Sequence, residues 1–336
     1  MCQPTETLPP AQRLRHVIAA YQAAREARRG LTKRPIISFR RAEAQSHLVC
    51  HQIPCRGRAG MNQSSPQRFD SLAMNYRTSE VHRASPTVDR LRALLPTVAA
   101  VCDVGSGAGH TALAFAGTAS RIVAVDPAPN MLAQLRELAA ERGIRVEAVQ
   151  AFAESIPLPS ASFDLVVCRL AAHHFADVAA AVREMARLAR PGGHVAVIDL
   201  EGAADPATDA LNHDIEVLHD PTHVRSYTAA RWRELFAAGG LEVVICEGRW
   251  REFPTGLTVG RWCELSRSGE EALRAIRERL ALAPAEWLAE LDIAQDADGD
   301  FRLPIRTLVI VGSKHVVQGA MRKTEQTTSK SHSSLR

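Results

Sequence analysis

The stretch VCDVGSGAGHTALAFA, which spans residues 101–116, decides the fold. The apolar, β-branched run at residues 98–104 predicts a strand, and the composition of residues 110–117 predicts a helix. Between them, three glycines alternate with other residues from Gly105 to Gly109, so the chain can turn sharply and bring bare backbone against a ligand. The helix that follows offers unpaired N–H groups to an anion. This unit therefore predicts a ligand-binding loop.

The same alternation of strand and helix continues beyond this unit. Further strands are predicted at residues 121–125, 145–150, 163–168, 194–200, 241–247 and 306–311, and helices at residues 130–143, 178–189 and 228–238. Strands that alternate with helices of this length predict an α/β fold with a doubly wound, parallel sheet. A mostly helical insertion, about residues 256–291, lies between the last two strands.

An acidic residue closes the second strand of this series. Asp126 lies 23 residues after Asp103, where a carboxylate can accept hydrogen bonds from ribose hydroxyls, and this favours a nucleoside-containing ligand. A dinucleotide-binding loop would carry a third glycine where His110 stands. The loop therefore fits S-adenosylmethionine better than NAD(P).

Four segments carry a resemblance to a known family. They are VCDVGSGAGHTALAFA (101–116), AVDPAPNMLAQL (124–135), AESIPLPSASFDLVVCRLAAHHF (153–175) and LARPGGHVAVID (188–199). With them the chain resembles the class I S-adenosylmethionine-dependent methyltransferases, in particular the small-molecule branch that includes the ubiquinone/menaquinone-biosynthesis C-methyltransferases. The resemblance implies a Rossmann-like sheet of seven mostly parallel strands, with an antiparallel last strand. It also implies methyl transfer to O, N or C of a small molecule.

The resemblance further implies a set of residues that bind the cofactor. They are Asp103, Gly105, Gly107 and Gly109 around the methionine moiety, Asp126 on the ribose, Met131 on the adenine, Ala153 and Glu154 at the adenine edge, Arg169 at the sulfonium end, and Arg68, Phe69 and Tyr76 in a lid. One residue departs from the family pattern, because Phe152 stands where Asp or Asn is usual. The adenine amino group then needs another acceptor, such as Glu154.

Histidines are the candidate catalytic groups, because a general base near neutral pH is needed only where the acceptor must lose a proton. His173 and His174 follow the fourth strand, at the crevice where open α/β sheets bind ligands. A second group, His213, His219, His223, Arg225 and Tyr227, lies in LNHDIEVLHDPTHVRSY. We take His174 and His223 as the catalytic candidates; packing, capping or surface roles are the alternatives. No metal is expected, because Pro221 breaks a helical His-x-x-x-His register.

Charge is distributed unevenly along the 336 residues, whose net charge is +4. Residues 1–60 carry +8 and residues 314–336 carry +4, whereas residues 61–313 hold 25 basic and 33 acidic side chains. An acidic body is unlike a nucleic-acid-binding surface, so no nucleic-acid partner is expected. Seven cysteines without a CxxC pair indicate reduced thiols in an intracellular protein, and no apolar run is long enough to span a membrane.

The expected organisation has three parts. Residues 1–60 form a basic extension that is dispensable or partly helical, residues 61–313 form the methyltransferase domain, and residues 314–336 form a disordered tail. We expect a cytoplasmic protein; the alternative is a mitochondrial one, if the Arg-rich start is a presequence. Two other functions stay open at this point: an S-adenosylmethionine-binding protein without catalysis and an NAD(P)-dependent oxidoreductase. The oligomeric state is open as well.

Overall fold

The computed structural model describes residues 64–78, 85–95 and 97–315. The expected basic extension, with its candidate helix, and all but the first two residues of the expected tail lie outside this range. No helix in the part of the chain that the structure describes combines the length and the apolar character needed to cross a membrane.

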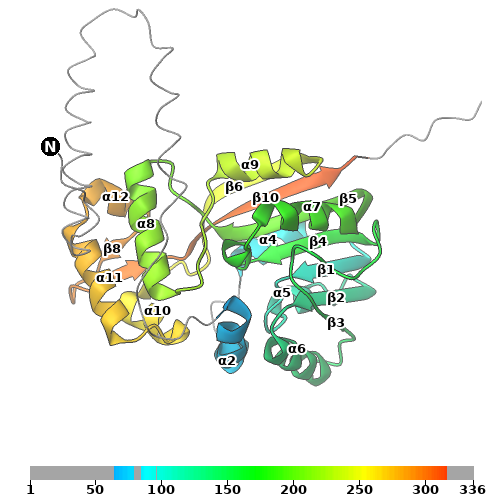
Figure 1. The fold of residues 1–336 in the computed structure, drawn as a ribbon, viewed down its shortest axis with the longest axis horizontal. Coiled ribbons are helices and arrows are strands. Elements are labelled where there is room, and N and C mark those ends of the chain that lie inside the picture. The colour runs from blue at the N-terminus through cyan, green and yellow to red at the C-terminus, as the bar shows by residue number, and fades with distance from the viewer. Residues whose placement is uncertain (1–63, 79–84, 96, 316–336) are drawn as a thin grey trace, which may run out of the picture.

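A seven-stranded sheet forms the centre of the fold (Figure 1). Its strands, in spatial order, are β3 (Glu147–Gln150), β2 (Arg121–Asp126), β1 (Ala100–Val104), β4 (Phe163–Arg169), β5 (Ala189–Leu200), β10 (Arg306–Lys314) and β6 (Leu241–Arg251). Only β10 runs antiparallel, and it pairs with β5 on one side and β6 on the other. The Rossmann-like fold predicted from the sequence is confirmed, including its antiparallel last strand.

Alternate residues of the strands face two helical layers, as the two-residue period of a strand requires. Cys102 and Val104 of β1 pack with α7 (Val178–Leu188) and α9 (Ala229–Ala238). On the other face, Val101 packs with α4 (Pro86–Leu94). That face also carries α5 (His110–Ala114) and α6 (Pro129–Glu141). Both faces of the sheet are therefore buried, and ligands can enter only at the ends of the strands.

The predicted insertion is mostly helical, and it packs with further elements into a larger unit than the sequence predicts. Its helices are α8 (Pro206–His219), α10 (Val259–Ser266), α11 (Glu270–Leu282) and α12 (Ala285–Glu290), and its small sheet consists of β7 (Leu257–Thr258), β9 (Phe301–Leu303) and β8 (Ala294–Gln295). These elements share a separate hydrophobic core around Trp262 and Trp287. In Figure 1 they lie on the left, beside the large sheet. The predicted range of about 256–291 missed α8, which joins this core through Leu211 and Ile215.

Helix α2 (Ser65–Thr78) connects the insertion to the sheet domain. Its Arg77 forms ion pairs with Glu137 and Glu141 of α6 at 2.6 and 2.5 Å. On the other side, the Arg68 guanidinium donates a hydrogen bond to the Ser266 carbonyl oxygen at the end of α10. Contacts on both sides therefore fix α2 between α6 and the insertion.

Strand β10 ends one residue later than the predicted domain boundary at 313. Lys314 is its last residue, and its ammonium donates 2.8 Å hydrogen bonds to the carbonyl oxygens of Ala186 and Ala189. These contacts satisfy backbone acceptors at the end of α7, as cationic side chains near helix C-termini commonly do. Lys314 therefore belongs to the fold and not to the tail.

A buried carboxylate, Glu252, joins the segment after β6 to distant parts of the sheet domain. Its side chain is fully buried and lies 2.8 Å from the Arg169 guanidinium at the end of β4. It also accepts hydrogen bonds from the hydroxyls of Ser85 and Thr87 at the start of α4. Residues separated by more than 80 positions along the chain thus share one acceptor.

Replacing Glu252 with Gln should lower the free energy of unfolding by about 3 kcal/mol, because Arg169 would lose a buried anionic partner. Urea denaturation of the full chain, followed by circular dichroism, measures the change. Glu247→Gln is the matched control, since the Glu247–Arg90 pair is only partly buried and should contribute much less. Equal effects of the two substitutions would contradict this account of Glu252.

Candidate active site

The site lies where the strand order reverses, between β1 and β4. In open α/β sheets, ligands bind in the crevice outside the carboxyl ends of the strands at such a point. The loop after β1 turns back over β2, because the N–H groups of Gly105 and Ser106 both donate to the Val125 carbonyl oxygen, at 2.8 and 3.0 Å. The loop after β4 carries Ala171 and the two adjacent histidines. These two loops form the floor of the crevice.

Two glycines of the loop after β1 allow two different close contacts. Gly105 has a φ of +69°, and a Cβ there would lie 2.5 Å from the Ala171 Cβ, so the two loops can meet only without a side chain. Gly109 has a φ of +88°, and a Cβ there would lie 2.7 Å from Leu135 of α6. Left-handed backbone favours glycine in both places. The first contact shapes the crevice, and the second packs α5 against α6.

Two acidic residues hold the loop in place. Asp126 accepts hydrogen bonds from the Gly107 and Ala128 N–H groups, at 2.8 and 2.9 Å. Asp103 accepts one from the Ala112 N–H at 2.9 Å, and its Oδ1 is buried without a partner in the described structure. Burial raises the pKa of Asp126 to about 6 and that of Asp103 to about 7, although these backbone hydrogen bonds oppose the shift.

Two cavities border the loop. The smaller, which we call the loop cavity, has a volume of about 70 Å³, and Ser106, Gly107, Asp126, Met131, Arg169 and Tyr76 are among the residues that line it. The larger, the outer cavity, has a volume of about 640 Å³, and Asp126, Phe152, Ala153, Glu154 and Phe175 are among those that line it. Asp126, Gly105 and Phe69 line both cavities. The two cavities therefore adjoin along the predicted ligand-binding loop.

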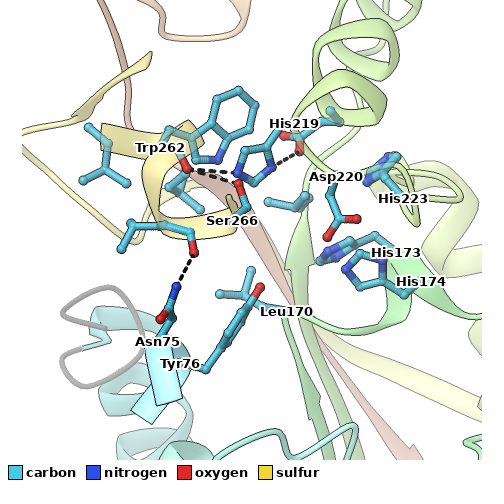
Figure 2. Close-up of a pocket in the computed structure, with 15 residues that line it drawn as sticks. Asn75, Tyr76, Leu170, His173, His174, His219, Asp220, His223, Trp262 and Ser266 are labelled. Carbon is cyan, nitrogen blue, oxygen red and sulfur yellow. Dashed lines mark hydrogen bonds and ion pairs between the residues drawn. The ribbon is translucent and has the colours of Figure 1, made fainter. Parts of the chain in front are cut away.

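A third cavity, the histidine cavity, lies between the sheet domain and the insertion and has a volume of about 100 Å³. Figure 2 shows Trp262 and His219 on one side, Asn75 and Tyr76 of α2 opposite them, and His173 and His174 on a third side. Its other lining residues are Leu170, Leu200, Glu216, Asp220, His223, Leu257, Leu265, Ser266 and Ile305. The wall is thus apolar except for histidines, two carboxyl groups and a few neutral polar groups.

His174 lines all three cavities. Its Nδ1 lies 3.1 Å from the Thr222 carbonyl oxygen, which can only accept a hydrogen bond, so Nδ1 carries the proton. Burial and the neighbouring His173 lower the pKa of His174, so the ring is neutral and its Nε2 carries a lone pair. Tyr76 and Leu170 each line the loop cavity and the histidine cavity. These three residues mark the passage between the cavities.

His173 differs from the other histidines because Asp199 lies behind it. The two side chains are 2.5 Å apart, and the Asp199 carboxylate also accepts the His173 backbone N–H. Burial opposes protonation of His173, but the charge and hydrogen bond of Asp199 outweigh it and raise the pKa. By contrast, burial and the surrounding histidines lower the pKa of His223 to about 2. The His223 Nε2 is buried and has no hydrogen-bond partner in the described structure.

Most of the predicted cofactor residues line the loop cavity or the outer cavity. They are Tyr76, Gly105, Gly107, Asp126, Met131, Ala153, Glu154 and Arg169. Asp103 and Gly109 lie behind the loop, where they contact α5 and α6 instead. Both catalytic candidates line the histidine cavity, His174 at its border and His223 deeper inside. Of the second histidine group, His213, Arg225 and Tyr227 are not on its wall.

Several residues of the histidine cavity escaped the sequence analysis. Glu216 and Asp220 stand at the end of α8, a helix that was not predicted, and Trp262 belongs to the distant α10. The spacing of Glu216, His219 and Asp220 places them on one helical face, which is a weak signal. Asp220 also pairs with Arg68 of α2 at 2.9 Å.

Comparison with known proteins gives a consistent result. Residues 102–197 match the family described as "Methyltransferase domain". The uncharacterized methyltransferase YcgJ of Bacillus subtilis is 41% identical over 142 residues, which are 42% of this chain and 56% of YcgJ. The uncharacterized protein YafE of Escherichia coli is 33% identical over 172 residues, half of this chain and 80% of YafE. The sequence match therefore spans only about half of YcgJ but most of YafE.

Solved structures agree with the sequence matches. The crystal structure of YcgJ superposes with a TM-score of 0.63 and 29% identity, covering 68% of this chain and 98% of YcgJ. A putative methyltransferase from Bacillus halodurans gives the same TM-score at 25% identity, with the same coverage. The chain belongs to the class I S-adenosylmethionine-dependent methyltransferases. This family membership confirms the resemblance inferred from the sequence and favours it over the NAD(P)-dependent oxidoreductase alternative.

The cofactor of this methyltransferase is S-adenosylmethionine. The residues around the loop fit such a group, because backbone without side chains faces the crevice at Gly105 and Gly107. The Ser106 hydroxyl on the wall of the loop cavity is buried and has no partner in the described structure. An unsatisfied polar group of this kind favours a polar ligand in the crevice.

Replacing Gly105 with Ala should lower the free energy of unfolding by about 2 kcal/mol or more, because left-handed backbone strain and the clash with Ala171 add together. Thermal unfolding of the full chain measures this. The same variant should bind S-adenosylhomocysteine more weakly, which calorimetry tests.

Substitutions at two other glycines separate the effect of backbone strain from the effect of the clash. Gly240→Ala introduces strain without a clash, since its φ is +74° and nothing lies within 4 Å of the added Cβ. It should lower the free energy of unfolding by about 1 kcal/mol. Gly117→Ala introduces neither and should change stability by less than about 0.5 kcal/mol. A Gly105→Ala protein as stable as the Gly117→Ala protein would contradict the close packing of the two loops.

Proposed function

We propose that the chain transfers a methyl group to O, N or C of a small molecule bound in the histidine cavity. The observation that carries this proposal is the position of His174 on the walls of all three cavities. An acceptor in the histidine cavity would meet a cofactor in the loop cavity at this residue. The small volume of the histidine cavity, about 100 Å³, supports a small acceptor, or a small part of one. A demethylmenaquinone methyltransferase of Thermus thermophilus, 35% identical over 30% of this chain and 46% of that protein, is consistent with a small-molecule acceptor.

The proposed cofactor placement follows the cavities. In it, Asp126 accepts the ribose hydroxyls, since it lines both cavities and each oxygen retains acceptor capacity beyond its one backbone hydrogen bond. Met131 packs on the adenine, and Ala153 and Glu154 line the cavity beside it. The exposed Phe152 adds an apolar surface at this end.

The same placement directs the methionine end toward the loop cavity. There Ser106, Tyr76 and Arg169 lie on the wall, and the Arg169 charge is compensated by Glu252. This compensation limits the repulsion that a bare guanidinium would exert on a sulfonium. Asp103 and Gly109 then act as positioning residues, because both shape the loop from behind.

S-adenosylmethionine, when bound, supplies a methyl group that is already activated for in-line displacement. The residues of the chain then have to orient the acceptor and exclude water, and positioning of this kind contributes on the order of 7–11 kcal/mol to lowering a barrier. In this proposal α2 acts as the lid: its Tyr76, together with Leu170, borders the passage and excludes water there.

His174 is the proposed proton acceptor. Its Nε2 carries the lone pair, as its hydrogen bond to Thr222 requires, and it faces the place where acceptor and cofactor would meet. His223, with its buried and unpartnered Nε2, would hold a polar group of the acceptor deeper in the cavity. The nearby His173–Asp199 pair fixes the loop that carries His174.

Full-chain protein incubated with isotopically labelled S-adenosylmethionine and cell extract should yield a labelled small molecule, detected by mass spectrometry. His174→Ala should lower kcat by about 100-fold or more, as loss of a general base does, and leave S-adenosylhomocysteine affinity within a few-fold. His315→Ala, an exposed histidine away from the cavities, is the control. Label found only in protein or nucleic acid would refute the small-molecule acceptor, and unchanged turnover of His174→Ala would remove its assigned role.

Cofactor affinity should depend on pH through Asp126. Its ionised form accepts the hydrogen bonds of the ribose hydroxyls, so binding favours that form, and protons compete as the pH falls through the raised pKa of about 6. Affinity for S-adenosylhomocysteine should therefore decrease from about pH 8 to about pH 5, with protons released on binding near pH 6.

Calorimetry in buffers of different ionisation enthalpy measures this proton release. Asp126→Asn should bind more weakly and lose the dependence near pH 6, because an amide does not titrate in this range. Glu242→Gln, which alters a carboxylate that is 65% exposed on β6, is the control. A pH-independent affinity of the unmodified protein would contradict the placement of the ribose on Asp126.

A further inference from the structure

The histidine cavity contains an uneven set of charges. Its wall in the described structure includes the carboxyl groups of Glu216 and Asp220 but neither lysine nor arginine. A third carboxylate, Asp199, lies directly behind the wall residue His173. Burial lowers the pKa of His174, His219 and His223, so these rings are neutral. The charge balance of the cavity therefore depends on how the three carboxyl groups are paired.

Two of the three carboxylates have cationic partners. Asp199 lies 2.5 Å from His173, whose pKa it raises against the effect of burial. Asp220 lies 2.9 Å from the Arg68 guanidinium and also accepts hydrogen bonds from the Thr222 N–H and hydroxyl groups. Their charges are compensated within the protein. Neither has to find a partner in a ligand.

Glu216 differs from both. In the described structure, its one ion-pair contact is with His219, whose Nδ1 lies 3.9 Å away. Burial raises the pKa of Glu216 to about 7, and the more distant charge of His173 offsets only part of this effect. The His219 Nε2 lies 3.2 Å from the Trp262 carbonyl oxygen, so Nε2 carries the proton and the neutral ring has a bare Nδ1. His219 therefore cannot donate to Glu216. A carboxyl group on the cavity wall is left without a donor among the described residues.

A second polar atom in the same cavity also lacks a partner. The His223 Nε2 is buried and makes no hydrogen bond in the described structure, and His223 is only 6% exposed. Buried polar atoms in folded proteins are almost always hydrogen-bonded, so such an atom on a cavity wall indicates a polar ligand group. Apart from Asn75, Ser266, the two carboxyl groups and the other histidines, the wall is apolar or aromatic, with Trp262 and Tyr76 on opposite sides (Figure 2).

We propose that the histidine cavity recognises a small amine in its cationic form, with the ammonium bound by Glu216 and an apolar or aromatic body between Trp262 and Tyr76. This inference rests on the proposed function, in which the cavity holds the methyl acceptor. Glu216 lines neither cavity beside the loop, whereas His174 lines both. The ammonium is therefore an anchor, and the methyl group goes to a different atom, at the end of the acceptor that reaches His174.

Three isosteric probes test the charge preference: benzylamine as the cation, benzyl alcohol as the neutral compound and benzoate as the anion. Each carries one aromatic ring, which suits a cavity of about this volume. The full chain is saturated with S-adenosylhomocysteine, and probe binding is measured by calorimetry or ligand-observed NMR. Benzylamine should bind about tenfold more tightly than benzyl alcohol, and benzoate more weakly than both.

Glu216→Gln should lower benzylamine affinity by about tenfold and leave benzyl alcohol affinity unchanged, because only the charge is removed. Glu216→Asp should retain part of the preference. Glu242→Gln, whose side chain is 65% exposed on β6, is the matched control and should change nothing. The unfolding midpoint and the affinity for S-adenosylhomocysteine show whether each variant is folded. If the Glu216→Gln protein is not folded, the relative affinities of the three probes for the unmodified protein test the proposal.

Benzoate binding as tightly as benzylamine, no benzylamine binding, or a Glu216→Gln protein with an unchanged preference would each overturn the assignment. These outcomes are distinct from failure of the proposed function. That function fails if labelled cofactor yields no methylated small molecule, whichever probe binds. The amine proposal fails by itself if methyl transfer to a small molecule is observed but the cavity shows no preference for a cation.

Discussion

The contact between the loops after β1 and β4 is the constraint on which the site depends. The two loops approach so closely that a Cβ on Gly105 would lie 2.5 Å from the Cβ of Ala171. Because Gly105 has no side chain, the loop after β1 can face the crevice while the loop after β4 closes the other side of the crevice. His174, three residues beyond Ala171, then reaches all three cavities. One glycine thus connects the cofactor side of the site to the acceptor side.

The acceptor side is assembled from three parts of the chain that share no local sequence relationship. The sheet domain contributes His173 and His174, α2 contributes Tyr76, and the insertion contributes Trp262. Ion pairs fix these parts relative to one another, since Arg68 connects α2 to Asp220 and Arg77 connects α2 to α6. Burial keeps most histidines neutral, so the electrostatic character of the cavity is set by its carboxyl groups.

The cofactor side was more predictable than the acceptor side, for a physical reason. Asp126 and the glycine loop belong to one strand–loop–helix–strand unit, in which hydrogen bonds between near neighbours fix the geometry. Even there, the sequence did not show that Asp103, a predicted cofactor residue, contacts the Ala112 N–H of α5. Arg169 lies on the wall of the loop cavity, and its ion pair with Glu252 joins residues 83 positions apart and leaves no local signal.

From the amino-acid sequence alone it was possible to determine the doubly wound fold, the cofactor loop and the presence of an insertion, because hydrophobic periodicity and glycine spacing are local properties. Only the tertiary structure could decide how the insertion is built, since α8 joins its core by long-range packing. The same holds for the charges in the histidine cavity. Whether Glu216 has a partner depends on which nitrogen of His219 faces Trp262, and that is settled by contacts between elements that are far apart in the chain.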